Sequence, residues 1–285
     1  MSAVRGHLLN RLLRDLPSGY LVDTAWLRER GLSASSVRDY VKRDWLERVG
    51  PRLYRRDSAN DTSPLRWETT LLSLMNLLNE PLHVGGLTAL ELAGYWHYAI
   101  VGRRRLWIYS DSQRTRTLLN RLTLDADPVV RSRKLFSEPE LGVATRALDL
   151  VTGSLGPEML AGDKSPVSHL QLLRASSLER AILETLDEVP GTVSFDHAAE
   201  LFEGLTTLRP RLATALLHAC RSVKAKRLFL YFASQHSYAW VRSVRREEVD
   251  IGSGKRQIVI GGRLDPDYLI TVPHERGPGA RRRKP

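Results

Sequence analysis

The first sixty residues contain two short helical segments separated by a turn of only three residues, GLS. Asp23 is placed to cap a first helix, TAWLRER, which Gly31 ends. Ser33 is placed to cap a second helix, from Ala34 to about Asp44. Two helices at this spacing form a helix-turn-helix, whose second helix usually enters the major groove of DNA. This feature constrains the N-terminal fold more than any other in the chain.

The flanking segments predict a winged form of the helix-turn-helix. Leucines recur at helical spacing from Gly6 to Leu16, which indicates a preceding helix. The segment from Tyr20 to Val22 is short and β-like. The sequence WLERVGPRLYRR predicts two short strands about a turn at Gly50 and Pro51, and this hairpin would form the wing.

The second helix begins with small hydroxyl residues and carries basic ones, a combination suited to contact with base edges. Small residues allow close approach, and Arg38 can bind guanine through two hydrogen bonds. Basic residues along the wing would contact phosphates. The candidate DNA-binding residues are Ser33, Ser35, Ser36, Arg38, Asp39, Lys42, Arg43, Arg48, Arg52, Tyr54, Arg55 and Arg56. The alternatives are a helical packing module with a solvated basic face and a winged helix that binds protein.

The charge balance favours a polyanion as the partner. Lys and Arg number 43 against 32 Asp and Glu, so the formal net charge is +11. Residues 1–60 contribute +5, residues 61–165 are balanced, and residues 166–285 contribute +6. A basic protein of this kind most often binds nucleic acid, although it can be merely basic and soluble. A second basic surface, or else a solvated face, is predicted from Lys224, Lys226, Arg227, Lys255 and Arg256.

Composition predicts an α+β protein in four parts. The polar linker SANDTSP and a stretch rich in Gly, Pro and Ser over residues 153–166 mark the boundaries. The expected parts are a winged helix-turn-helix over 1–60, an α/β part over 61–165, a helical and β part over 166–276, and a disordered basic tail over 277–285.

Hydrophobic patterns predict the elements of the two central parts. In the first, a helix over 65–78 is followed by the strand PLHVGG, the helix LTALELAGYW and the strands RRRLWIYSD and PVVRSRKLF. In the second, three helices are expected over 177–188, 195–202 and 209–223. The strands RQIVIGG and DYLITVP, flanking a turn over 263–266, complete this part.

Motifs for catalysis are missing, so we expect no enzyme, no metal and no cofactor. GSGK at 252–255 is not a phosphate-binding loop, because Val249 replaces its first Gly and Arg256 follows the Lys. His83, Glu91 and His97 can meet around one helix, where a structural role is favoured. The single cysteine, Cys220, excludes an internal disulfide and is expected to be a buried small hydrophobe. No apolar stretch reaches the ~18 residues of a membrane span, and we expect a cytoplasmic protein.

Several segments resemble AbiEi-type antitoxins of bacterial type IV toxin–antitoxin and abortive-infection (phage defence) systems. They are LERVGPRLYRR, LHVGGLTALELAGYWH and KAKRLFLYFASQHSYAWV, and the run from SGKR to DYLITVP is the most specific of them. The resemblance extends from about Leu16 to Pro273. By motif position it implies that Ser35, Ser36, Arg38, Lys42 and Arg43 form the recognition helix and that Arg52, Tyr54 and Arg55 belong to the wing.

The resemblance implies an autoregulating antitoxin. Its N-terminal winged helix-turn-helix would bind inverted repeats in its own promoter and repress the operon. A larger mixed α/β C-terminal antitoxin domain would counteract a nucleotidyltransferase-like toxin without a stable complex. We expect a monomer in solution, with two or more copies on operator DNA. The alternative is a DNA-binding transcriptional regulator with a ligand- or protein-sensing C-terminal domain and no toxin partner.

Overall fold

The computed structural model describes residues 2–56, 64–95, 102–159 and 170–274. Its contacts divide the chain into two compact units. The first comprises residues 1–88, 97–133 and 143–175, and the second comprises residues 89–96, 134–142 and 176–285. Neither unit is a continuous stretch of chain. The boundaries expected at residues 60 and 165 stay predictions, and the tail over 277–285 lies outside the described residues.

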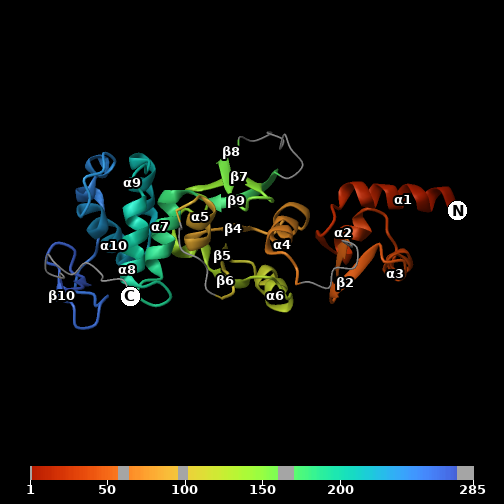
Figure 1. Ribbon diagram of the computed structural model, residues 1–285, viewed down its shortest axis with the longest axis horizontal. Coiled ribbons are helices and arrows are strands. Elements are labelled where there is room, and N and C mark those ends of the chain that lie inside the picture. Colours follow the sequence, from red (N-terminus) through yellow and green to blue (C-terminus); the bar gives the residue numbers. More distant parts are fainter. Residues whose placement is uncertain (1, 57–63, 96–101, 160–169, 275–285) are drawn as a thin grey trace, which may run out of the picture. The chain divides into compact units, whose positions relative to one another are not determined.

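The N-terminal module of the first unit has the element order of a winged helix (Figure 1). Its elements are α1 (Ser2–Asp15), β1 (Leu21–Asp23), α2 (Thr24–Glu29), α3 (Ala34–Lys42), β2 (Leu46–Gly50) and β3 (Leu53–Arg56). The three strands form an antiparallel sheet in the order β1-β3-β2. The predicted helices and hairpin are therefore confirmed, and the recognition helix ends two residues earlier than expected.

One side-chain cap fixes the start of each helix of the helix-turn-helix. Asp23 Oδ1 accepts the N–H of Trp26 at 2.8 Å, and Ser33 Oγ accepts the N–H of Ser36 at 3.1 Å. Such caps satisfy backbone donors that have no partner within the helix. Each of the three helices has a buried face, and the buried side chains of the module include Leu12, Leu16, Trp26, Leu27, Val37 and Tyr40.

A six-stranded mixed sheet forms the rest of the first unit, in the order β6-β5-β4-β9-β7-β8. The strands are β4 (Leu82–Val84), β5 (Arg105–Ser110), β6 (Asp127–Arg131), β7 (Val143–Asp149), β8 (Leu155–Glu158) and β9 (Leu170–Ser176). Its helices are α4 (Trp67–Leu72), a π-helical turn η1 (Ser73–Leu77) and α6 (Gln113–Arg121). Helix α5 (Gly86–Leu92) begins in this unit, and its residues from Ala89 onward belong to the second. Helix α6 and strands β7 to β9 were not predicted.

The second unit is mainly helical, and its helix α7 packs against α9 and α10 (Figure 1). The helices are α7 (Leu178–Asp187), α8 (Phe195–Gly204), α9 (Pro210–Ala219) and α10 (Val223–Ser234). Short 3-10 turns are η2 (Arg133–Leu135), η3 (Val241–Ser243) and η4 (Arg246–Glu248), and the strands are β10 (Arg263–Leu264) and β11 (Thr271–Val272). The first three helices of this unit confirm the prediction, whereas α10 was not expected.

The segment RQIVIGG is not a strand, which corrects the prediction. Thr271 Oγ1 accepts the N–H groups of Ile258 and Val259, at 2.8 and 2.9 Å. A side chain therefore satisfies donors that a strand ladder would otherwise pair. The expected turn over 263–266 is partly strand, because Arg263–Leu264 pairs with Thr271–Val272.

Candidate nucleic-acid interface

The outward face of helix α3 presents hydroxyl and basic side chains to solvent. Ser35, Arg38, Lys42 and Arg43 are exposed, while Val37 on the opposite face is buried. Among the described residues, these three basic side chains form no ion pair. Their charge is therefore available to a polyanion.

The remaining hydroxyl and acidic candidates on α3 have local roles as well. Ser33 Oγ caps the helix and lies 2.8 Å from Ser35 Oγ and 2.9 Å from Ser36 Oγ. Ser36 and Asp39 are half-buried. The hydroxyl groups of Ser33, Ser35 and Ser36 form one cluster at the N-terminus of the helix. This is the end that a recognition helix points at base edges.

The wing is a tight hairpin with arginines at its exposed edge. Pro51 and Arg52 form its two-residue tip, where Arg52 has a left-handed backbone with φ of +59°. Arg48 and Arg52 are exposed, and Tyr54 is half-buried. The backbone carbonyl of Arg52 accepts the N–H of Thr24 at 3.1 Å, so the tip is bonded to the start of α2.

Two further wing arginines differ from the sequence-based prediction: Arg55 is buried, and Arg56 is half-buried with its guanidinium bound to the backbone. Arg55 is 5% exposed and donates from Nε to Glu47 Oε2 at 2.8 Å. Arg56 Nη1 donates to the carbonyl oxygens of Leu13 and Leu16, at 2.7 and 2.8 Å. Arg55 therefore holds the two wing strands together, and Arg56 caps the end of α1.

The predicted second basic surface does not form as one surface. Lys226 and Arg227 are buried, and Lys226 Nζ donates to the carbonyl of Asp250 at 3.0 Å. Lys224 is half-buried and donates to the carbonyl of Asp187. Only Lys255 and Arg256 of this group are exposed.

Arg227 instead organises the loop that contains GSGK. Its guanidinium donates to the carbonyl oxygens of Ile251 at 2.8 Å, Gly254 at 2.6 Å and Leu269 at 3.2 Å. Burial and the nearby charge of Arg256 lower the pKa of Arg227 from its usual value. Sequence reasoning missed this role, although the position of Arg227 next to the apolar run LFLYFA was a signal for burial.

Residues considered for catalysis have structural positions. His83 is buried on strand β4, where its ring stacks on Tyr109 with centroids 5.4 Å apart, and His97 lies outside the described residues. Cys220 is 2% exposed, and burial raises its thiol pKa to about 11. In the described part of the chain, no group of three His, Cys, Asp or Glu side chains is arranged to hold a metal ion.

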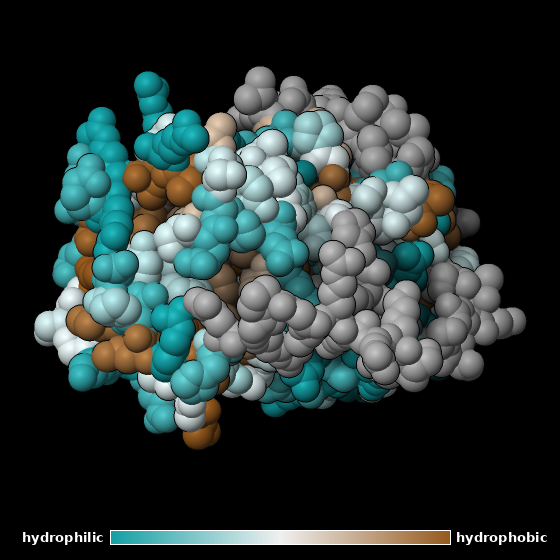
Figure 2. Space-filling view, turned by 60° about the vertical axis from the view of Figure 1, so that its left-hand side comes forward, coloured by the Kyte–Doolittle hydropathy of each residue, from teal (hydrophilic) through white to brown (hydrophobic). Residues whose placement is uncertain are grey.

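The surface drawn in Figure 2 shows hydrophobic residues in small separate groups among hydrophilic ones. Large hydrophobic side chains that are strongly exposed include Val151, at 79%, and Ile260, at 90%. Across the described residues, no helix is long and apolar enough to cross a membrane. The exposed basic side chains of α3 are a surface feature that indicates a polyanion partner.

The order α1-β1-α2-α3-β2-β3, with a basic face on α3, defines the winged helix-turn-helix class of DNA-binding domains. Residues 5–100 match the model described as "Transcriptional regulator, AbiEi antitoxin N-terminal domain". Residues 157–273 match "Transcriptional regulator, AbiEi antitoxin, Type IV TA system". The two matches together span about three quarters of the chain, which belongs to the AbiEi antitoxin family of transcriptional regulators.

A solved structure supports the fold over nearly the whole length. The crystal structure of the RV2827C protein from Mycobacterium tuberculosis aligns with a TM-score of 0.50 and 17% identity, covering 92% of this chain and 89% of that one. At this identity the likeness concerns the fold alone. The search of curated proteins gave no match.

Proposed function

We propose that this protein binds inverted repeats in its own promoter through the N-terminal module and represses its operon. The observation that carries the proposal is the exposed face of α3, where Arg38, Lys42 and Arg43 have no described ion-pair partner. A basic helix with small residues at its start can approach base edges in the major groove closely. Membership of a family of transcriptional regulators supports the same function.

The geometry suggests a division of labour among the exposed side chains. Arg38 lies beside the serine cluster at the start of α3 and is suited to read a guanine. Lys42 and Arg43 at the end of α3, with Arg48 and Arg52 on the wing, are suited to hold phosphates. Arg55 and Arg56 stabilise the module and take no direct part.

Replacing Arg38 tests the base-reading role. Arg38→Ala should weaken binding to the upstream DNA by about 1–3 kcal/mol and weaken binding to random DNA less. Arg11→Ala is a matched control, because Arg11 is an exposed arginine on α1 outside the proposed interface. Equal losses on both DNAs would show that Arg38 contributes only charge.

We infer that the rest of the chain counteracts a nucleotidyltransferase-like toxin without forming a stable complex with it. Support comes from the match of residues 157–273 to a family of type IV antitoxins. The full-length Arg38→Ala variant separates the two activities, because the residue lies on α3 and outside residues 157–273. This variant should lose repression of a promoter reporter but still rescue cells that express the toxin from a neighbouring nucleotidyltransferase gene.

The second candidate is a DNA-binding regulator that has no toxin partner. It makes the same prediction for the promoter reporter and the opposite one for the rescue experiment. Wild-type protein that represses the reporter but fails to rescue cells from the neighbouring gene product would favour this candidate.

A further inference from the structure

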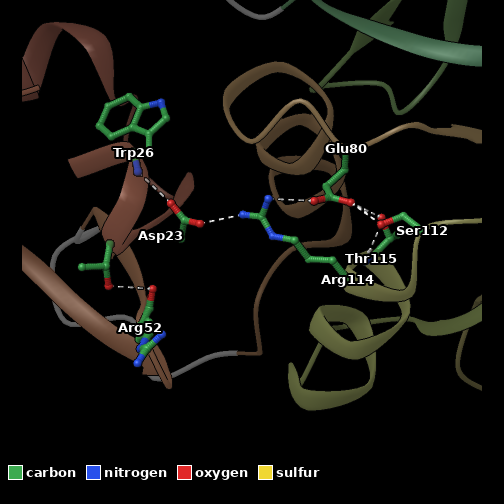
Figure 3. Close-up of polar contacts among 8 residues, drawn as sticks. Asp23, Trp26, Arg52, Glu80, Ser112, Arg114 and Thr115 are labelled. Carbon is green, nitrogen blue, oxygen red and sulfur yellow. Dashed lines mark hydrogen bonds and ion pairs between the residues drawn. The ribbon is translucent and has the colours of Figure 1, made fainter. Parts of the chain in front are cut away.

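A chain of charged and polar contacts joins the start of helix α2 to helix α6 and to the loop before strand β4, all in the same compact unit (Figure 3). Asp23 Oδ1 accepts the N–H of Trp26 at 2.8 Å, and its Oδ2 accepts Arg114 Nη2 at 2.6 Å. One carboxylate therefore starts the first helix of the helix-turn-helix and also binds an arginine on α6, 91 residues away in sequence.

The other side of the guanidinium is held by a buried carboxylate. Arg114 Nη1 lies 3.1 Å from Glu80 Oε1, and the Glu80 side chain is 5% exposed. Glu80 Oε2 accepts the hydroxyl groups of Ser112 and Thr115, both at 2.7 Å. Because both Glu80 oxygens are engaged, the carboxylate is fixed and fixes Arg114 in turn. We call this series, Asp23–Arg114–Glu80, the arginine bridge.

A second polar contact lies next to the arginine bridge. The N–H of Leu21, on strand β1, donates to Ser73 Oγ at 2.8 Å in a buried position. Strand β1 lies against the helical turn η1 that contains Ser73. The backbone connection between the module and the sheet passes through residues 57–63, outside the described residues. The arginine bridge reaches the start of the helix pair itself.

We propose that Arg114 is a positioning residue for DNA binding, and the proposal rests on the function proposed above. The arginine bridge holds the helix-turn-helix in one orientation against α6 and the loop before β4. When two copies on an inverted repeat touch each other through this part of the chain, the fixed orientation sets the distance between their recognition helices. The preferred spacing of the half-sites then depends on Arg114 and Asp23, neither of which needs to contact DNA.

The bridge can be broken without removing the cap of α2. In Asp23→Asn the remaining oxygen still accepts the Trp26 N–H, and Asn is as good a helix cap as Asp. The oxygen that accepts from Arg114 becomes an NH₂ group. Because both this group and the guanidinium are hydrogen-bond donors, the contact with Arg114 is lost. Glu29→Gln is the matched control, since Glu29 is exposed on the same helix and its replacement changes the charge equally.

A second variant breaks the bridge from the opposite side. Arg114→Gln removes both carboxylate contacts but leaves Glu80 with its two hydroxyl donors. Arg121→Gln is its matched control, because Arg121 is an exposed arginine near the end of the same helix. Thermal unfolding of all four full-length variants establishes that each is folded.

The test measures binding to a single half-site and to inverted repeats whose spacing is varied. Wild-type protein should bind the native spacing best. Asp23→Asn and Arg114→Gln should bind the single half-site within twofold of wild type but lose about tenfold of the preference for native spacing, a coupling of ordinary size. Both control variants should keep that preference. A loss of stability alone would weaken half-site binding as well.

The outcomes separate the two proposals. If wild-type protein does not prefer its upstream DNA to a scrambled duplex, the proposed function is wrong. If it does, and the bridge variants keep the wild-type spacing preference, the positioning role is wrong and the proposed function stands. Wild-type protein that binds the repeat with no spacing preference would likewise overturn the positioning role.

Discussion

The wing contains two arginines whose replacement should affect different properties, DNA binding for one and stability for the other. Arg52 is exposed at the tip, whereas Arg55 is 5% exposed and bound to Glu47 on the neighbouring strand. Arg52→Gln should weaken DNA binding and leave the unfolding temperature unchanged. Arg55→Gln should lower the unfolding temperature and leave the salt dependence of DNA binding unchanged.

The size of the Arg52 effect follows from the number of exposed cations placed for phosphates. Lys42, Arg43, Arg48 and Arg52 make four. At about −0.9 per phosphate, the logarithm of the binding constant should fall with the logarithm of salt at a slope of about −3.6. Between about 50 and 200 mM salt, the affinity of the wild-type protein should then fall about 150-fold. For Arg52→Gln, with three such cations, the slope should be about −2.7 and the affinity should fall about 40-fold over the same range.

Arg55→Gln removes the ionic contact with Glu47 and should cost about 1–2 kcal/mol of unfolding free energy, since Glu47 is half-exposed. Fluorescence anisotropy on a labelled duplex across the salt series gives the slopes, and thermal unfolding gives the stabilities. An Arg55→Gln protein of wild-type stability, with a slope flattened as much as in Arg52→Gln, would refute the reasoning.

Three further changes test other parts of the structure. Glu184→Gln leaves the buried Arg180 guanidinium facing an amide and should cost about 3–5 kcal/mol in denaturant unfolding; a loss below about 1 kcal/mol would contradict the pairing. Ser33→Ala removes the cap of α3 and should cost about 1 kcal/mol by the same assay, against no change if the cap is dispensable. Cys220, with its pKa raised to about 11, stays a neutral buried thiol at about pH 8, so native protein should resist iodoacetamide and unfolded protein should not; equal labelling rates would contradict its burial.

Sequence alone could predict the N-terminal module because its signals are local. Asp23 and Ser33 each cap the helix that follows them directly. The hairpin forms where expected, although its tip is Pro51 and Arg52, one residue later than the predicted turn at Gly50 and Pro51. Each feature depends on residues within a few positions of one another. The base-contact candidates Ser35 and Arg38 followed from the same local pattern, and the structure leaves both exposed.

The elements that sequence could not predict depend on distant partners. Strand β9 pairs with β4 across the chain, Val84 against Ala175, and nothing in either segment specifies the other. The run Ile258 to Ile260 has the β-branched composition of a strand, but Thr271 supplies the acceptor that its backbone uses. A strand requires a neighbour at the right distance, which composition does not provide.

Whether a basic side chain is exposed or buried was the feature that the sequence predicted least well. Charge indicates that Arg55 and Arg227 prefer water, yet each is buried because the fold supplies acceptors to its guanidinium. For Arg55 the signal was present, since Glu47 lies directly opposite it in the hairpin register. For Arg227 the acceptors are carbonyl oxygens of loops more than twenty residues away, and no sequence pattern identifies them.

The central claim is that the winged helix recognises the operon's own promoter. Fluorescence anisotropy of full-length protein on its upstream DNA, compared with a scrambled duplex at about 0.15 M salt, tests it most directly. The account predicts binding to the upstream DNA at least about a thousandfold tighter than to the scrambled duplex, the lower end of the range for specific recognition. Equal affinity for the two duplexes would contradict it and would leave only nonspecific attraction to the basic face of α3.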